Sequence, residues 1–200
     1  MSGPAVLTAG GLTLIRAANG GHRIELRDAD NLVACFESIE PVEPSAAENA
    51  NWPASPPVQE WHDEARAGAT ALMAVGRAGR SHWSLSCEVT ADGHATFDVA
   101  ARISERPLRL GSSYLLCEGT PQDLVPAQKQ RLGGSLALPE TVSANRLQFA
   151  GGWQLAVDSL TTLLRYNAET RTVTIEPAPA PAASWPQTIR WRYSFERFFK

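Results

Sequence analysis

The clearest pattern in the chain is an alternation of apolar and polar residues between positions 82 and 103. From His82 to Thr90, and again from Ala95 to Ile103, apolar residues occupy every second position. Successive side chains of a strand point to opposite faces of a sheet, so this period predicts two strands that are each buried on one face. The intervening Ala91-Asp92-Gly93 predicts a three-residue hairpin loop with glycine at a positive φ.

One register of this hairpin satisfies both its loop and its apolar residues. If Thr90 pairs with His94, the apolar residues of the two strands oppose one another, Leu85 with Val99 among them. A slip by one residue would place the Asp98 carboxylate in the core, where an unpaired charge is strongly unfavourable. The predicted register is therefore well specified.

Two short apolar runs near the N-terminus predict a second hairpin around Asn19-Gly20,. Pairing of Arg16 with His22 would place four apolar residues on one face. These residues are Leu12, Leu14, Ile24 and Leu26. A tighter two-residue turn would instead oppose Ile15 to Ile24, and the sequence leaves both registers open.

The segment from Thr188 to Phe199 also alternates, with Trp191 and Tyr193 on its apolar face. We expect this face to dock into the core, because it is too apolar for a free tail. The proline- and alanine-rich stretch before it, residues 177–186, is expected to be extended and to cross between sheets.

The rest of the chain is predicted to contain further strands separated by loops and short helical segments. We expect a long loop at 41–57, a short helix at 58–66, a strand at 69–75 with a turn at 76–79, a strand at 108–117, a long excursion at 118–146 with a helical turn at 123–131, and a hairpin at 160–176. About ten short strands with frequent turns favour an all-β fold. We predict a single domain, residues 1–200, that is an antiparallel β-sandwich or open barrel with long loops and little helix.

Composition narrows the classes of partner. A net charge of −3 argues against nucleic acid,, and we interpret Arg190, Arg192, Arg197 and Lys200 as a solvated strand face. The chain contains no run of eighteen apolar residues that could span a membrane, and no signal peptide is recognisable. We therefore expect a cytoplasmic protein.

The three cysteines lie in separate apolar runs and form no Cys-x-x-Cys pair. Cys35, Cys87 and Cys117 are therefore predicted to be buried structural thiols in a reducing compartment,. Phosphate-binding glycine loops, zinc-protease motifs and nucleophile elbows are absent, and the histidines lack ligand spacing. We expect neither a cofactor nor a metal, and we interpret the acidic run from Glu60 to Glu64 as a solvated helical turn.

The polar face of the central hairpin is the candidate ligand-binding surface. Its short hydrogen-bonding side chains suit sugar hydroxyls or another polar ligand, although the wet side of any antiparallel sheet is polar. The predicted register places Ser86 opposite Asp98 and Glu88 opposite Thr96. The candidate residues are His82, Ser84, Ser86, Glu88, Thr96, Asp98 and Arg102.

We consider three functions for this chain. The favoured one is a non-enzymatic domain that binds a carbohydrate, another polar ligand or a protein partner, on the analogy that sandwiches often carry such sites. The second is a hydrolase, lyase or epimerase that uses His82 or His94 with Glu88 or Asp98. The third is a structural domain that forms a homo-oligomer through an edge strand such as 188–199.

Two strand patterns also carry a resemblance. The run "SHWSLSCEV…ATFDVAARI" over residues 81–103, together with the closing "IRWRYSF", resembles β-rich proteins of no known function from planctomycete-type bacteria. The resemblance covers about a third of the chain. It implies a bacterial origin and a β-rich fold, and it transfers no functional residue.

Overall fold

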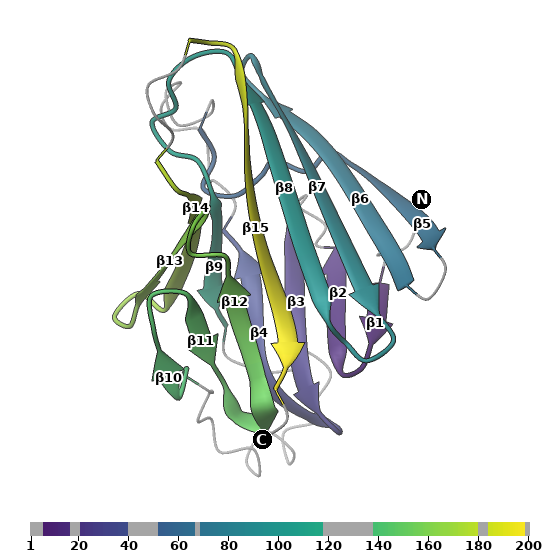
Figure 1. Cartoon of the computed structure of the whole chain (residues 1–200). Coiled ribbons are helices and arrows are strands. Elements are labelled where there is room, and N and C mark those ends of the chain that lie inside the picture. The colour runs from purple at the N-terminus through teal and green to yellow at the C-terminus, as the bar shows by residue number, and fades with distance from the viewer. Residues whose placement is uncertain are drawn as a thin grey trace.

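The computed structural model describes residues 6–16, 21–39, 52–66, 69–117, 138–179 and 184–198. Within them the fold is all-β, with two antiparallel sheets that pack face to face and do not close into a barrel (Figure 1). The predicted antiparallel sandwich is confirmed. A single 3-10 turn, Ala150–Gly152, is the helical element of these residues, and none of them forms a helix that is long and apolar enough to cross a membrane.

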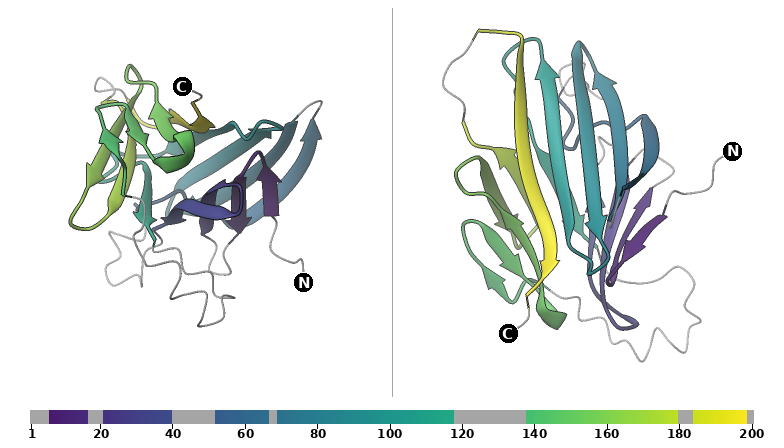
Figure 2. Two further views of the ribbon diagram at one scale, coloured as in Figure 1. Left: turned by 90° about the horizontal axis from the view of Figure 1, so that it is seen from below. Right: turned by 45° about the vertical axis from the view of Figure 1, so that its right-hand side comes forward.

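Each sheet combines strands from distant parts of the sequence. In spatial order, the seven-stranded sheet contains β1 (Val6–Ala9), β2 (Leu12–Arg16), β3 (His22–Asp28), β4 (Asn31–Ser38), β9 (Ser112–Leu116), β14 (Thr172–Pro177) and β13 (Thr162–Asn167). The eight-stranded sheet contains β10 (Thr141–Val142), β11 (Arg146–Gln148), β12 (Trp153–Val157), β15 (Gln187–Arg197), β8 (Ala95–Ile103), β7 (Ser81–Thr90), β6 (Ala69–Ala78) and β5 (Glu60–Arg66). Figure 2 shows strands β1 to β4 as a layer of their own beneath the long strands of the second sheet.

The central hairpin has the predicted register. Leu85 lies opposite Val99, and the Thr90 N–H donates to the His94 carbonyl at 3.0 Å. Gly93 closes the loop at a φ of +87°, a conformation that glycine adopts without strain. The apolar faces of both strands are buried in the core.

The N-terminal hairpin follows the first of its two candidate registers. Arg16 pairs with His22 and Leu14 with Ile24, so the tighter turn is ruled out. The hairpin predicted at 160–176 is also present, as β13 and β14. The loop at 41–57 and the excursion at 118–146 fall largely outside the described residues, and the helical turn at 123–131 lies wholly outside them.

The helix predicted at 58–66 is wrong, because this segment forms the edge strand β5. Seven consecutive residues of β5 pair with β6, and Trp61 packs against the core. A helix of two turns is unstable in isolation. Pairing with β6 satisfies the same backbone groups and also buries part of the indole.

The turn predicted at 76–79 is also displaced, because β6 continues to Ala78 and turns at Gly79-Arg80. Gly76 serves a different purpose from the one expected. A Cβ atom at this position would lie 1.8 Å from the Pro57 carbonyl oxygen. The glycine therefore allows the chain before β5 to cross close to β6, and it does not mark a turn.

β15 lies inside its sheet and not at an edge. It pairs with β12 on one side and with β8 on the other, and Trp191, Tyr193 and Phe195 are almost fully buried. Docking of this segment into the core is confirmed. β14 ends at Pro177 in one sheet and β15 begins at Gln187 in the other, so the chain changes sheets between them, as predicted. Self-association through this strand as a free edge is wrong, because its backbone groups are already paired.

A chain of polar side chains crosses the core and ties the two sheets together. The His22 Nε2 lies 2.8 Å from the Tyr114 hydroxyl, which lies 2.5 Å from the Tyr193 hydroxyl. The Trp191 Nε1–H donates to the Ser112 Oγ at 3.0 Å. Burial lowers the pKa of His22 to about 4 and raises the pKa of Tyr193, so both groups are neutral at pH 7.

Stability should fall on acidification because of His22. Burial holds its pKa at about 4 in the folded protein, against an ordinary value of 6.5 for histidine, so the unfolded chain takes up the proton first. The stabilisation is complete above pH 6.5 and is lost as the pH falls towards 4, by about 3 kcal/mol. Urea unfolding at pH 7, 5.5 and 4.5 should show a smaller loss for His22→Gln, which keeps a polar group beside Tyr114. Equal losses in both proteins would contradict this role of His22.

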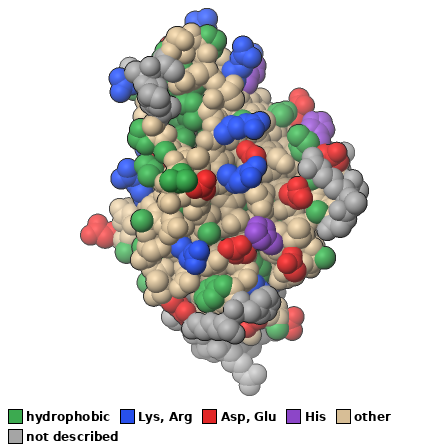
Figure 3. Space-filling view, viewed as in Figure 1, with side chains coloured by type: hydrophobic (Ala, Val, Ile, Leu, Met, Phe, Trp, Pro, Cys, Tyr) green, Lys and Arg blue, Asp and Glu red, His purple; other side chains and the backbone are tan. Residues whose placement is uncertain are grey.

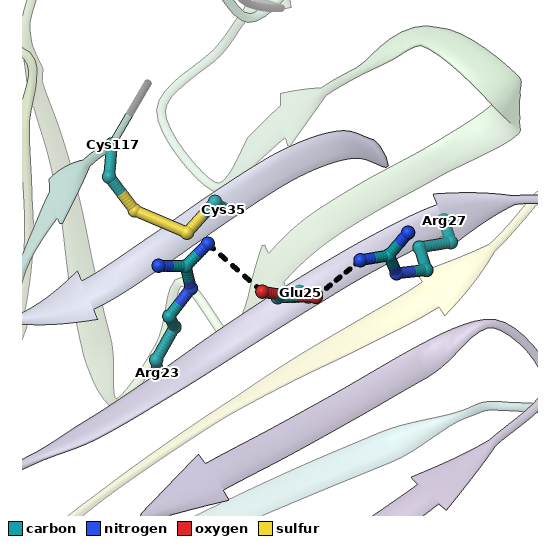
Figure 4. The surroundings of a disulfide bond; sticks show 5 residues. All are labelled: Arg23, Glu25, Arg27, Cys35 and Cys117. Atoms are coloured by element: carbon teal, nitrogen blue, oxygen red, sulfur yellow. Dashed lines mark hydrogen bonds and ion pairs between the residues drawn. A yellow bond between two sulfur atoms is a disulfide. The ribbon is translucent and has the colours of Figure 1, made fainter. Parts of the chain in front are cut away.

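Two of the three cysteines are joined, contrary to the prediction of free thiols. Cys35 on β4 forms a disulfide with Cys117 just after β9, with the Cα atoms 5.4 Å apart (Figure 4). Antiparallel pairing of β4 with β9 brings together residues separated by 82 positions, which sequence spacing could not reveal. Cys87 is the buried free thiol that was expected, and burial raises its pKa.

The disulfide has a direct chemical test. Alkylation of the denatured protein without reductant should modify Cys87 alone, and alkylation after reduction should modify all three cysteines, as counted by intact mass. Because the bond closes a loop of 82 residues, the double variant Cys35→Ser/Cys117→Ser should lose about 2–4 kcal/mol of unfolding free energy. Three modified cysteines without reductant would show that the bond does not form.

Candidate functional site

All seven predicted site residues lie on one surface, the outer face of the eight-stranded sheet, which Figure 3 views directly. The predicted pairs are present, with Ser86 opposite Asp98, Glu88 opposite Thr96 and His82 opposite Arg102. These side chains are exposed or half-buried, whereas their neighbours along each strand are buried. The central strands thus hold the polar residues on a surface that the packed core supports from behind.

The flanking strands add residues that the sequence did not assign to this surface. β15 places Arg190 opposite Ala100 and Arg192 opposite Asp98, and β6 places Arg77 opposite His82. The alternation on β15 indicated which residues would face outward. The pairing of β15 with β8 could not be predicted, because more than eighty residues separate the two strands.

One depression on this face is basic, and we call it the basic hollow. Its volume is about 550 Å³, and Glu60 is the one acidic residue among those that line it. In Figure 3, Lys and Arg side chains predominate over the upper half of the face, and Asp and Glu over the lower half. The residues that define the basic hollow here are Arg77, His82, Ser84, Ala100, Arg102 and Arg190.

Side-chain size explains the shape of the basic hollow. Ser84 and Ala100 are direct cross-strand neighbours, and their short side chains form its floor. Long side chains surround this floor: Arg102 and Arg190 lie beside Ala100, and Arg77 lies across β7 from Arg102. The depression is therefore built into rigid strands and does not depend on a loop.

Another depression on this face, which we call the mixed hollow, has a volume of about 320 Å³. Arg192 on β15 donates to Asp98 on β8 at 2.7 Å, and in this ion pair each charge compensates the other. Donors and acceptors therefore stand close together, as recognition of sugar hydroxyls requires. The residues that define the mixed hollow here are Ser86, Glu88, His94, Thr96, Asp98 and Arg192.

His94 connects the mixed hollow to a residue that the sequence did not assign to any site. Its Nε2 lies 3.1 Å from the Thr96 hydroxyl, and its Nδ1 lies 3.3 Å from Glu196 on β15. Gln154 on β12 donates to the same Glu196 carboxylate. The predicted pairing of a histidine with Glu88 or Asp98 is thus replaced by a pairing of His94 with Glu196.

The outward-facing positions of β6, β7, β8 and β15 hold no Trp, Tyr or Phe, because the aromatic residues within these strands, Trp83 behind the basic hollow among them, are buried in the core. Ligands of this face would therefore be held by hydrogen bonds and charge, without an aromatic platform. The acidic run of β5 lies at the sheet edge, where Glu60 is 3.7 Å from His62 and both are largely exposed. Its interpretation as a solvated surface agrees with this exposure, although the helix does not form.

The described residues contain no group of three His, Cys, Asp or Glu side chains that could hold a metal ion. Comparison with known proteins adds no assignment: the chain matches no protein-family model, and no curated protein is similar to it in sequence.

Proposed function

We propose that this protein is a non-catalytic binding domain that holds a carbohydrate ligand on the outer face of its eight-stranded sheet. One observation carries the proposal. The register of β7 and β8 brings seven polar residues to one solvent-facing surface, and this surface is hollowed in two adjoining places. A surface of hydroxyl, carboxylate and guanidinium groups matches the many hydroxyls of a sugar.

The form of the two hollows favours binding over catalysis. Enzymes usually enclose the reacting atoms and exclude water. His82, Ser84 and Arg102 are instead exposed, and the hollows lie open on the face of the sheet. An open face of this kind suits a segment of a polysaccharide chain, which can lie across it without entering a pocket.

The disulfide supports a role outside the reducing cytoplasm. Disulfides persist in oxidising compartments and are rare in the cytosol. The cytoplasmic location expected from the cysteine count is therefore not the one we propose. A domain in the periplasm or outside the cell meets polysaccharides directly, which agrees with the proposed ligand.

The binding face can be tested with Asp98→Asn. This change removes an acceptor charge from the mixed hollow and preserves side-chain size, so affinity for the best ligand of a glycan array should fall about tenfold. Asp30→Asn, an exposed substitution beyond β3 in the other sheet, is the matched control and should bind like the wild type. Absence of binding to every glycan, or equal binding by both variants, would contradict the proposal.

One observation favours a second candidate, a hydrolase. His94 contacts the Thr96 hydroxyl through one ring nitrogen and the Glu196 carboxylate through the other. Enzymes that activate a hydroxyl place nucleophile, base and orienting carboxylate in the same order. Release of nitrophenol from nitrophenyl esters should then require His94 and be abolished in His94→Gln. Turnover that is indistinguishable from the buffer blank, or equal in the variant, would exclude this candidate.

A further inference from the structure

We propose that the basic hollow binds the anionic group, carboxylate or sulfate, of an acidic polysaccharide. This inference rests on the proposed function, because it names the class of sugar that the same face takes. The charge of the hollow, its geometry and the residues that surround it all favour such a ligand.

The first argument is uncompensated charge. Arg77, Arg102 and Arg190 line the hollow, and none of the ion pairs between described residues includes any of them. The one lining carboxylate, Glu60, stands beside His62. Three guanidinium groups therefore face one carboxylate, in a chain whose net charge is −3. An anion in the hollow would relieve this local repulsion.

The second argument is geometry. Arg77, His82 and Arg102 are direct neighbours on three adjacent strands, so the Cα atoms of the two arginines lie about 10 Å apart at the usual strand spacing. Arg190 is the diagonal neighbour of Arg102, at about 7–8 Å. The guanidinium groups thus surround a floor made by Ser84 and Ala100, and their planar forks can hold a carboxylate or sulfate by two hydrogen bonds at once.

The third argument separates a sugar from a nucleic acid. Binding of single-stranded nucleic acid relies on aromatic side chains on which the bases stack, and the outward-facing positions of β6, β7, β8 and β15 have none. In the adjoining mixed hollow Asp98 is paired with Arg192, and the Ser86 and Thr96 hydroxyls stand beside them; this balanced set of donors and acceptors suits sugar hydroxyls better than a continuous phosphate backbone. An acidic polysaccharide meets both conditions, since it carries anionic groups and neutral hydroxyls along one chain.

The experiment measures binding of polygalacturonate, of its carboxyl-reduced form, of dextran sulfate and of single-stranded DNA to the full chain by calorimetry. We expect binding of polygalacturonate, or of dextran sulfate if the anionic group is a sulfate, and about tenfold weaker binding of the uncharged form. Affinity should fall as salt is raised, because charges carry the recognition.

Three variants locate the site. Arg102→Gln and Arg190→Gln should each weaken binding of the acidic polymer about tenfold, and Ala100→Leu should do the same by filling the floor without a change of charge. Arg146→Gln on β11, which removes an equal charge from an exposed residue outside the hollow, should bind like the wild type. Thermal unfolding of each variant establishes that the fold is retained.

The outcomes distinguish this inference from the function on which it rests. If the chain binds neutral glycans through Asp98 and the arginine variants bind like the wild type, the acidic ligand is wrong and the binding face remains. If it binds no glycan, both are wrong. If DNA binds more tightly than either acidic polysaccharide and the arginine variants lose that binding, the hollow is a phosphate site and the polysaccharide is overturned.

Discussion

The fold and its candidate site both depend on the two-residue side-chain period that β7, β8 and β15 share. In the observed register Trp83, Phe97 and Tyr193 all point into the core, and every intervening residue therefore points to solvent. A slip of one residue in any of these strands would bury a charge such as that of Asp98 and expose an aromatic ring. The packing of the core thus fixes which residues form the outer face.

Contacts between and within the sheets support this outer face from behind. The Tyr114 and Tyr193 hydroxyls meet across the core, and Trp153 on the eight-stranded sheet donates to the Arg27 carbonyl on the other. The disulfide secures β4 to the end of β9 within the seven-stranded sheet. On the same sheet Glu25 is held between Arg23 and Arg27, at 2.9 and 2.8 Å (Figure 4). A binding surface supported in this way needs little reorganisation when a ligand arrives.

Local patterns in the sequence were sufficient for the β7–β8 and β13–β14 hairpins and for the identity of the outward-facing residues on β7 and β8. Pairings between distant strands could not be predicted from the sequence. These pairings bring Arg190 and Glu196 to the outer face and place Cys117 beside Cys35. Two local predictions failed for a reason that only the tertiary structure reveals. β5 is a strand because β6 offers it a partner, and Gly76 lies within a strand, paired with β7, where its missing side chain leaves room for the Pro57 carbonyl. Propensity alone carries no information on either contact.

The proposed function depends on ligand binding at the outer face of the eight-stranded sheet. The most direct measurement is a titration of the ¹⁵N-labelled protein with a galacturonic acid trisaccharide, followed by amide chemical shifts. We expect shifts concentrated at Ser84, Ala100, Arg102 and Arg190, fading towards β11 and β10 at the far edge of the sheet. Shifts located on the seven-stranded sheet, or spread without a centre, would contradict this placement of the ligand.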